Sequence, residues 1–361
     1  MDLHDLKQQV LSNCDVTDAQ HAGIYSVCGL VMRLRDLYKW EHRLLPWQDD
    51  APAKVLDWIG EKEALWETLM DAPYGPIGLD GRHYEAFDTT AINERLRPHR
   101  LFYGAGYAHS LKPTFFLADI ERVTQVSGHT VITTGNEYAR DLLTLPAFSQ
   151  EGGVVLRLEA GRMFLWDHIL YLGRSGRNAL HYAARACGLP DAGIDTLRHG
   201  FDKLWPAQKA LYIQHEIGEL EETVFDAATW QQMLADYPHT AVELLVRTLK
   251  DLLADTGPCG ALTDLIDRRD KTGLGLYMAF GNGITRILTT ALRCAFDAFI
   301  ADSRWERMAE AAVKMRLDVA AYAGDVMTLY QAAQARGDID SGRDAIERTM
   351  ADRGLLSKPP A

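Results

Sequence analysis

The spacing of the hydrophobic residues changes twice along the chain, from helical to strand-like and back to helical. This succession of spacings constrains the fold more than any other feature. Residues 3–70 and residues 174–354 repeat apolar side chains at helical spacing, three or four residues apart. Between them, three segments have the composition of strands: residues 114–123, 130–134 and 154–158. This order predicts a mainly α fold of the α+β class, in which a small antiparallel sheet is inserted between helical halves.

The changes of period divide the chain into three regions. We predict an N-terminal helical region over residues 1–98, the sheet insertion over residues 99–172, and a C-terminal helical region over residues 173–355. Residues 71–99 are rich in Gly, Pro and Asp, so we expect loop and turns there, with a short helix at residues 90–96.

Residues 213–225 are the only place where one histidine and four acids crowd into two helical turns. At about 100° per residue the apolar side chains form one stripe, and His215, Glu219 and Glu222 lie together on the opposite side. Side chains one helical turn apart project one above the other. His215 and Glu219 can therefore bind the same metal ion.

The sequence H-E-I-G-E at residues 215–219 resembles the H-E-x-x-H helix of zinc hydrolases, with Glu219 in place of the second histidine. The resemblance implies that His215 and Glu219 are metal ligands and that Glu216 is the base that polarises the attacking water. A carboxylate in place of a histidine shifts the preference from a pure zinc site towards iron or manganese. We therefore expect a divalent metal ion, with iron, manganese and zinc all left open.

A second predicted helix, residues 239–255, offers a similar pair. His239 and Glu243 are again four residues apart and lie on one flank of the apolar stripe, whereas Arg247, Asp251 and Asp255 lie opposite that stripe. Two helices that each contribute a His/Glu pair can hold one or two ions. The predicted metal ligands are therefore His215, Glu219, His239 and Glu243.

The alternative to a metal site is a solvated helix face. Polar residues opposite an apolar stripe are typical of any such face, and a surface pair of His215 and Glu219 contributes only about 0.3–0.5 kcal/mol. Gly218 favours the metal site over the solvated face, because a glycine inside a helix lowers helix stability by about 1 kcal/mol relative to alanine. Its presence predicts that another element or a ligand approaches the helix closely there.

Four basic residues are further candidates. Arg35 falls inside the apolar stripe of a helix predicted over residues 18–45, so it needs an acid partner. It forms either a structural ion pair or an anchor for an anionic substrate, a role for which Arg247 is the other candidate. His109 and Lys112 precede the first strand, where an ordinary solvated loop is the alternative to a site.

The composition excludes several classes of function. A net charge of −12 and a pI of about 5.5 argue against nonspecific nucleic-acid binding, which requires a basic face. No apolar run approaches the roughly 20 residues of a membrane span, and the sequence begins without the basic and apolar regions of a signal peptide. The five cysteines are scattered without a C-x-x-C pair, which is typical of a reducing compartment. We expect a cytoplasmic protein with neither a nucleic-acid nor a membrane partner.

Several stretches together resemble an uncharacterised bacterial family of unknown function. They are Y-K-W-E at residues 38–41, W-I-G-E-K-E at 58–63, Y-G-A-G-Y and K-P-T-F-F-L-A within 103–118, H-E-I-G-E, and K-D-L-L-A-D-T at 250–256. The resemblance covers most of the chain and implies that the sheet and both helical halves form one unit. It implies no activity.

Two hypotheses of different classes follow. In the first, the protein is a metal-dependent hydrolase or oxidoreductase acting on a small, anionic substrate, with Glu216 as acid/base and Arg35 or Arg247 as the anchor. In the second, it is a non-catalytic helical binding or scaffold protein, whose acids are solvated and whose loop at residues 74–81 contacts a partner. The sequence leaves a homo-oligomer open.

Overall fold

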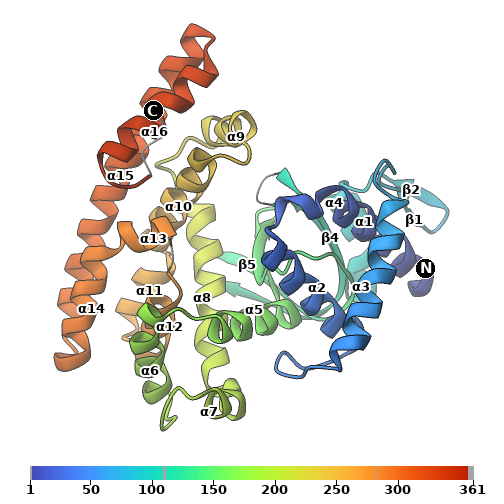
Figure 1. The fold of residues 1–361 in the computed structure, drawn as a ribbon, viewed down its shortest axis with the longest axis horizontal. Coiled ribbons are helices and arrows are strands. Elements are labelled where there is room, and N and C mark those ends of the chain that lie inside the picture. The colour runs from blue at the N-terminus through green and yellow to red at the C-terminus, as the bar shows by residue number, and fades with distance from the viewer. Residues whose placement is uncertain (1, 109–110, 282, 357–361) are drawn as a thin grey trace. The chain divides into compact units, whose positions relative to one another are not determined.

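The computed structural model of the chain describes residues 2–108, 111–281 and 283–356. The chain folds into two compact units, Met1–Leu170 and Tyr171–Ala361 (Figure 1). The helices predicted before residue 98 and the sheet that follows them both belong to the first unit.

The α-helices described in the first unit are α1 (Leu3–His21), α2 (Val27–Glu41), α3 (Pro52–Glu67), α4 (Thr89–Leu96) and α5 (Leu158–Leu170). The prediction of one helix over residues 18–45 is wrong, because α1 ends at His21 and a short 3-10 turn leads to α2. Ser26 caps α2, since its hydroxyl accepts a hydrogen bond from the backbone N–H of Gly29 at 3.2 Å. The short helix predicted at residues 90–96 is confirmed by α4.

A five-stranded sheet follows α4 in the chain. Its strands are β3 (Leu101–Tyr107), β4 (Pro113–Val126), β5 (His129–Arg140), β6 (Ala147–Gln150) and β7 (Gly153–Arg157), in the spatial order β3-β4-β5-β7-β6. The sheet is mixed, because β7 pairs in parallel with β5, whereas the other described neighbours pair antiparallel as expected. After β5 the chain first forms β6 at the edge of the sheet. It then returns through a tight turn as β7, which lies between β5 and β6.

A two-stranded hairpin lies where only loop and turns are expected from the sequence. β1 (Ile77–Leu79) pairs antiparallel with β2 (Arg82–Tyr84) through Asp80 and Gly81, whose φ angles are 51° and 76°. Two consecutive residues with positive φ form the primed turn that joins tight hairpins, and Asp-Gly is a preferred sequence for it. The Asp-Gly pair is therefore the signal for this hairpin.

The core of the first unit lies between α1 and the sheet, where α1 packs against β4 and β5. A buried ion pair also ties two strands of the sheet together: Arg157 at the end of β7 donates to both carboxylate oxygens of Glu137 on β5, at 2.7 and 2.8 Å. Apolar side chains of this core include Leu6, Val10, Tyr103, Phe115 and Leu117.

A second buried ion cluster corrects the expectation of a solvated loop at Lys112. The Lys112 ammonium is fully buried and lies 3.1 Å from Asp18 Oδ1 and 3.6 Å from Asp141 Oδ2. Both carboxylates also accept backbone N–H groups, so the buried charges are compensated. Lys112 thus joins α1 to the sheet. His109 lies outside the described residues.

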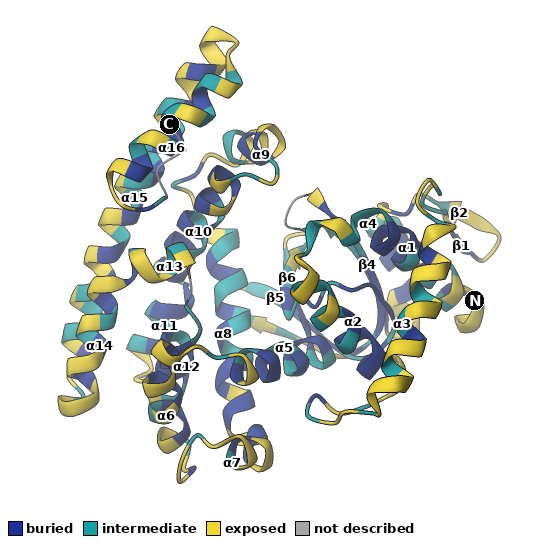
Figure 2. Cartoon of the chain, in the orientation of Figure 1, coloured by how far each residue is buried: buried dark blue, intermediate teal, exposed yellow. Residues whose placement is uncertain are grey.

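The second unit is helical, as predicted for the C-terminal region. Figure 2 shows that its longer helices carry buried and exposed faces. Its described α-helices are α6 (Arg177–Ala186), α7 (Ile194–His199), α8 (Phe201–Glu221), α9 (Ala227–Asp236), α10 (Ala241–Asp255), α11 (Ala261–Asp267), α12 (Lys271–Phe280), α13 (Gly283–Leu288), α14 (Thr290–Asp302), α15 (Trp305–Arg336) and α16 (Ile339–Asp352).

Two observations bear on the expected location of the protein. Within the described part of the chain, every helix is too short or too polar to cross a bilayer. All five cysteines are free thiols, and Cys28 and Cys294 are exposed. The cytoplasmic location stays a prediction.

Candidate metal centre

The candidate site is formed where α8 packs against α10 in the second unit. A Cβ atom added to Gly218 of α8 would lie 2.4 Å from the carbonyl oxygen of Ala254 and 3.1 Å from the Cα of Gly260. The close approach predicted from this mid-helix glycine is therefore confirmed, and the approaching element is the C-terminal end of α10 with the loop that follows it.

One hydrogen bond and one ion-pair contact fix the imidazole of His215. Its Nδ1 lies 2.8 Å from Asp255 Oδ1 on α10, and its Nε2 lies 3.5 Å from Glu219 Oε1, one turn further along α8. The Tyr277 hydroxyl on α12 donates to the other oxygen of Asp255 at 2.9 Å. Side chains from α8, α10 and α12 thus meet around one histidine.

Charge and burial move the pKa values of this cluster in opposite directions. Desolvation opposes a charge on His215, but Asp255 and Glu219 outweigh it and hold the imidazole pKa well above its usual value. Desolvation also opposes a charge on Glu219, yet contact with His215, aided by Lys250, lowers its pKa to about 2. Burial raises the pKa values of Glu216 and Asp251 to about 7. Near neutral pH the cluster therefore combines fixed charges with two carboxyls that can exchange protons.

Three side chains lie close enough together to hold a metal ion. Ligand atoms of His215, Glu219 and Asp251 all lie within 4.8 Å of one another, and this is the one such group found in the described part of the chain. Because the Asp255 carboxylate can only accept, Nδ1 carries the proton of its hydrogen bond, and a metal ion would have to displace the second proton of the imidazolium from Nε2. One imidazole and two carboxylates suit iron, manganese or zinc, and they leave coordination positions for water or substrate.

The predicted ligands His239 and Glu243 do not join this group. Glu243 is buried, and its carboxylate accepts hydrogen bonds from the backbone N–H of His239 at 2.9 Å and from Arg247 Nε at 3.0 Å. The Thr240 hydroxyl accepts the backbone N–H of Glu243 at 3.2 Å, so T-A-V-E forms a helix-capping motif that starts α10. Glu243 is eight residues from Asp251 along α10, or about 12 Å at 1.5 Å per residue. That distance is too long for a shared ion.

Both arginines predicted as substrate anchors are already in ion pairs. Arg247 contacts Glu243, and in the first unit Arg35 Nη2 lies 2.7 Å from Asp167 Oδ1 and 3.2 Å from Asp36 Oδ1. The side chains of Asp36 and Asp167 are almost completely buried. The structural ion pair predicted as one alternative for Arg35 is therefore confirmed.

The acids that face His215 are not among the ligands predicted from the sequence. The i, i+4 pair Asp251 and Asp255 lies opposite the apolar stripe of α10, a position that is visible in the sequence. The same helix also offers His239 and Glu243, and only the packing of α8 against α10 decides which pair reaches the histidine. Tyr277 comes from α12 and has no local sequence pattern that could identify it.

Two family models match the chain. One describes the N-terminal domain of a family of unknown function (DUF6866) and matches residues 5–157, and the other describes the C-terminal domain of that family and matches residues 162–353. Comparisons with curated proteins and with solved structures gave no match. The two models together span most of the chain, as the resemblance implies, and the bacterial origin stays a prediction.

Proposed function

The chain belongs to the DUF6866 family, a family of unknown function, and from the cluster on α8 and α10 we propose that it is a divalent-metal-dependent enzyme. In this proposal His215, Glu219 and Asp251 hold an iron, manganese or zinc ion, and Glu216 is the acid/base. The proposed substrate is a small, anionic molecule.

The observation that carries the proposal is the hydrogen bond from His215 to Asp255 behind the three converging ligand atoms. Histidines that bind metals usually donate their second ring N–H to a carboxylate or carbonyl, which fixes the tautomer and the ring orientation. Asp255 is itself held by the Tyr277 hydroxyl, so three helices determine where Nε2 points. A solvated pair of His215 and Glu219 requires no such support.

The residues around the cluster favour hydrolysis. A divalent ion supplies Lewis acidity, because it lowers the pKa of bound water and polarises a substrate oxygen. Glu216, whose pKa burial raises to about 7, can accept a proton near neutral pH and return it to a leaving group. Lys250 Nζ lies 3.7 Å from Glu219 Oε2 and places a positive charge beside the cluster, which favours an anionic substrate. Oxidation is the second reaction type, and it requires iron or manganese because zinc is redox-inactive.

A structural role is the competing function, and the charge balance of the cluster favours it. Asp255 contacts His215, and Glu219 contacts both His215 and Lys250. The Lys250 ammonium also lies 4.3 Å from the centre of the Trp230 ring. In a non-catalytic binding or scaffold protein these contacts would hold α8 against α10 without an ion. Only the enzyme requires stoichiometric metal.

Metal content of the full chain purified without chelator, followed by titration with Mn²⁺, Fe²⁺ and Zn²⁺, tests the proposal. We expect one ion per chain, and an affinity lower by about tenfold or more in His215→Ala and in Asp251→Asn. The matched controls are His181→Ala and Asp267→Asn, which replace exposed residues of the same unit and should bind the ion as the unmodified protein does. If no ion binds, or if Asp251→Asn and Asp267→Asn bind it equally well, the structural role holds instead.

A further inference from the structure

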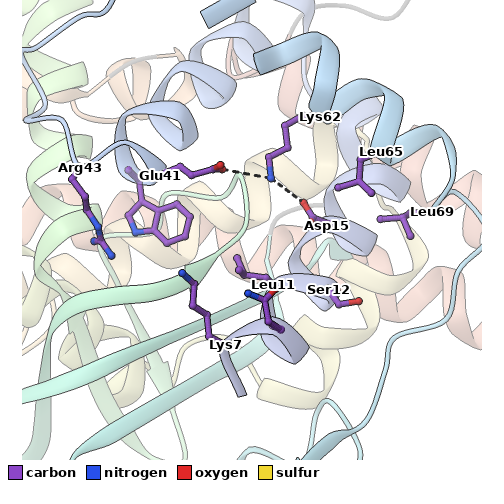
Figure 3. Close-up of a pocket in the computed structure, with 11 residues that line it drawn as sticks. Lys7, Leu11, Ser12, Asp15, Glu41, Arg43, Lys62, Leu65 and Leu69 are labelled. Carbon is purple, nitrogen blue, oxygen red and sulfur yellow. Dashed lines mark hydrogen bonds and ion pairs between the residues drawn. The ribbon is translucent and has the colours of Figure 1, made fainter. Parts of the chain in front are cut away.

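A pocket of about 450 Å³ opens in the first unit between α1, the end of α2 and α3 (Figure 3). Ligand-binding pockets commonly have volumes of 300–1,000 Å³ and combine apolar walls with a few polar groups. This pocket has a volume in that range but a more polar lining, because five charged side chains line it together with three leucines and a tryptophan. All its lining residues lie between positions 7 and 69, so it is formed by the first unit alone.

The acids of the pocket are already compensated. Lys62 Nζ lies 3.4 Å from Asp15 Oδ1 and 3.5 Å from Glu41 Oε2, and so bridges α1 and the end of α2 (Figure 3). Asp15 and Lys62 are each about four-fifths buried, so water screens their attraction less than at an open surface. The acidic side of the pocket therefore has its own cation and does not require one from a ligand.

The basic side of the pocket is less well compensated. Within the described residues, Lys7 makes no ion pair and no side-chain hydrogen bond, although it lines the pocket. The half-exposed guanidinium of Arg43 is 3.6 Å from the nearest carboxylate oxygen, on Glu159. A ligand anion placed here would meet two cations, only one of which already has an acid nearby.

Apolar side chains form the wall away from these two cations. In Figure 3, Leu65 of α3 and Leu69 of the turn that follows it lie on the side of the pocket opposite Lys7 and Arg43. Leu65 is 40% exposed, and Leu69 packs against the apolar cluster beneath the three helices. An apolar group bound against this wall would remove exposed leucine surface from water, which is favourable.

We propose that this pocket binds a small organic carboxylate with an apolar body. The carboxylate contacts the Lys7 ammonium and the Arg43 guanidinium, and the apolar body lies against Leu65 and Leu69. A bare inorganic anion would leave the leucine wall exposed, and an organic cation would meet Lys7 and Arg43 with like charge. The proposal is independent of the metal cluster, because no residue is shared.

Calorimetric titration of the full chain with three probes tests this pocket. Octanoate carries both the charge and the apolar body, octylammonium carries the opposite charge on the same body, and acetate lacks the body. We expect octanoate to bind at least about tenfold more tightly than either of the other two, since a charge-assisted contact commonly changes affinity by that factor or more.

Two variants locate the binding. Lys7→Gln removes one cation, and Ser12→Trp fills the pocket from an exposed position on α1, so both should weaken octanoate binding about tenfold or more. Lys54→Gln is the matched control, because Lys54 is an exposed lysine of α3 that does not line the pocket. Equal binding of octanoate and octylammonium, no octanoate binding at millimolar concentration, or the same affinity in Lys7→Gln and Lys54→Gln would each overturn the proposal.

Discussion

Replacing Gly218 by alanine sets two effects of known size against each other. Alanine is favoured over glycine inside a helix by about 1 kcal/mol, so local propensity alone predicts stabilisation. The new Cβ would, however, lie 2.4 Å from the Ala254 carbonyl oxygen, about 1 Å closer than the 3.4 Å at which ordinary contact begins. Overpacking of this kind costs about 1–3 kcal/mol, and the upper end applies because the contacting atoms belong to backbone. We therefore expect a net loss of about 2 kcal/mol.

Gly324→Ala is the matched control for this experiment. Gly324 lies inside α15 of the same unit, and a Cβ added there would meet nothing within 4 Å. This variant should gain up to about 1 kcal/mol from helix propensity alone. Urea unfolding followed by circular dichroism measures both changes. If Gly218→Ala is instead stabilised as Gly324→Ala is, α8 and α10 are not in the close contact that the structure shows.

Three further predictions concern ion pairs and the cluster. Arg35→Leu should lower the free energy of unfolding by about 3 kcal/mol, because it leaves buried acids without their cation, and an unchanged urea midpoint would contradict this. Burial and Asp36 raise the pKa of Asp167 to about 8. The folded state therefore binds the Asp167 proton more tightly than the unfolded state does. This contribution to the free energy of unfolding is lost as pH rises from about 4 through 8. Asp167→Asn should therefore flatten the fall in stability measured between pH 5 and 9, and a slope identical to that of the unmodified protein would exclude this assignment. Tyr277→Phe removes the hydrogen bond that holds Asp255 and should weaken Mn²⁺ binding about 10–100-fold without loss of helix content, whereas an unchanged affinity would separate Tyr277 from the metal centre.

Local patterns in the sequence are sufficient where neighbouring residues decide the structure. Helical spacing identifies α8, and Gly218 within it predicts a close contact because a glycine there is unfavourable by itself. The short helix α4 follows in the same way from local sequence. The turn at Asp80 and Gly81 is also decided locally, because the preference of Asp-Gly for this turn type resides in two adjacent residues.

The errors arise where residues distant in the sequence decide the outcome. Lys112 looks like part of a polar loop, but Asp18 makes it a buried residue from 94 positions away. Glu243 has the spacing of a metal ligand, yet the same spacing serves the start of a helix, and only the partners of its carboxylate distinguish the two. His215 is identified correctly as the centre of a cluster, but its acid partner Asp255 is 40 residues away.

The insertion of β7 between β5 and β6 has a consequence for the synthesis of the protein. The ribosome makes β6 before β7, so the edge of β5 that pairs with β7 stays unpaired until residue 157 has been added. Glu137 on β5 also lacks its ion-pair partner until that residue is made, because Arg157 donates two hydrogen bonds to it. At about 5–20 residues per second, the stretch from the end of β5 to the end of β7 takes about 1–3 s to make. An open strand edge is a template for pairing with other chains, so during this interval the nascent first unit is most exposed to misassociation.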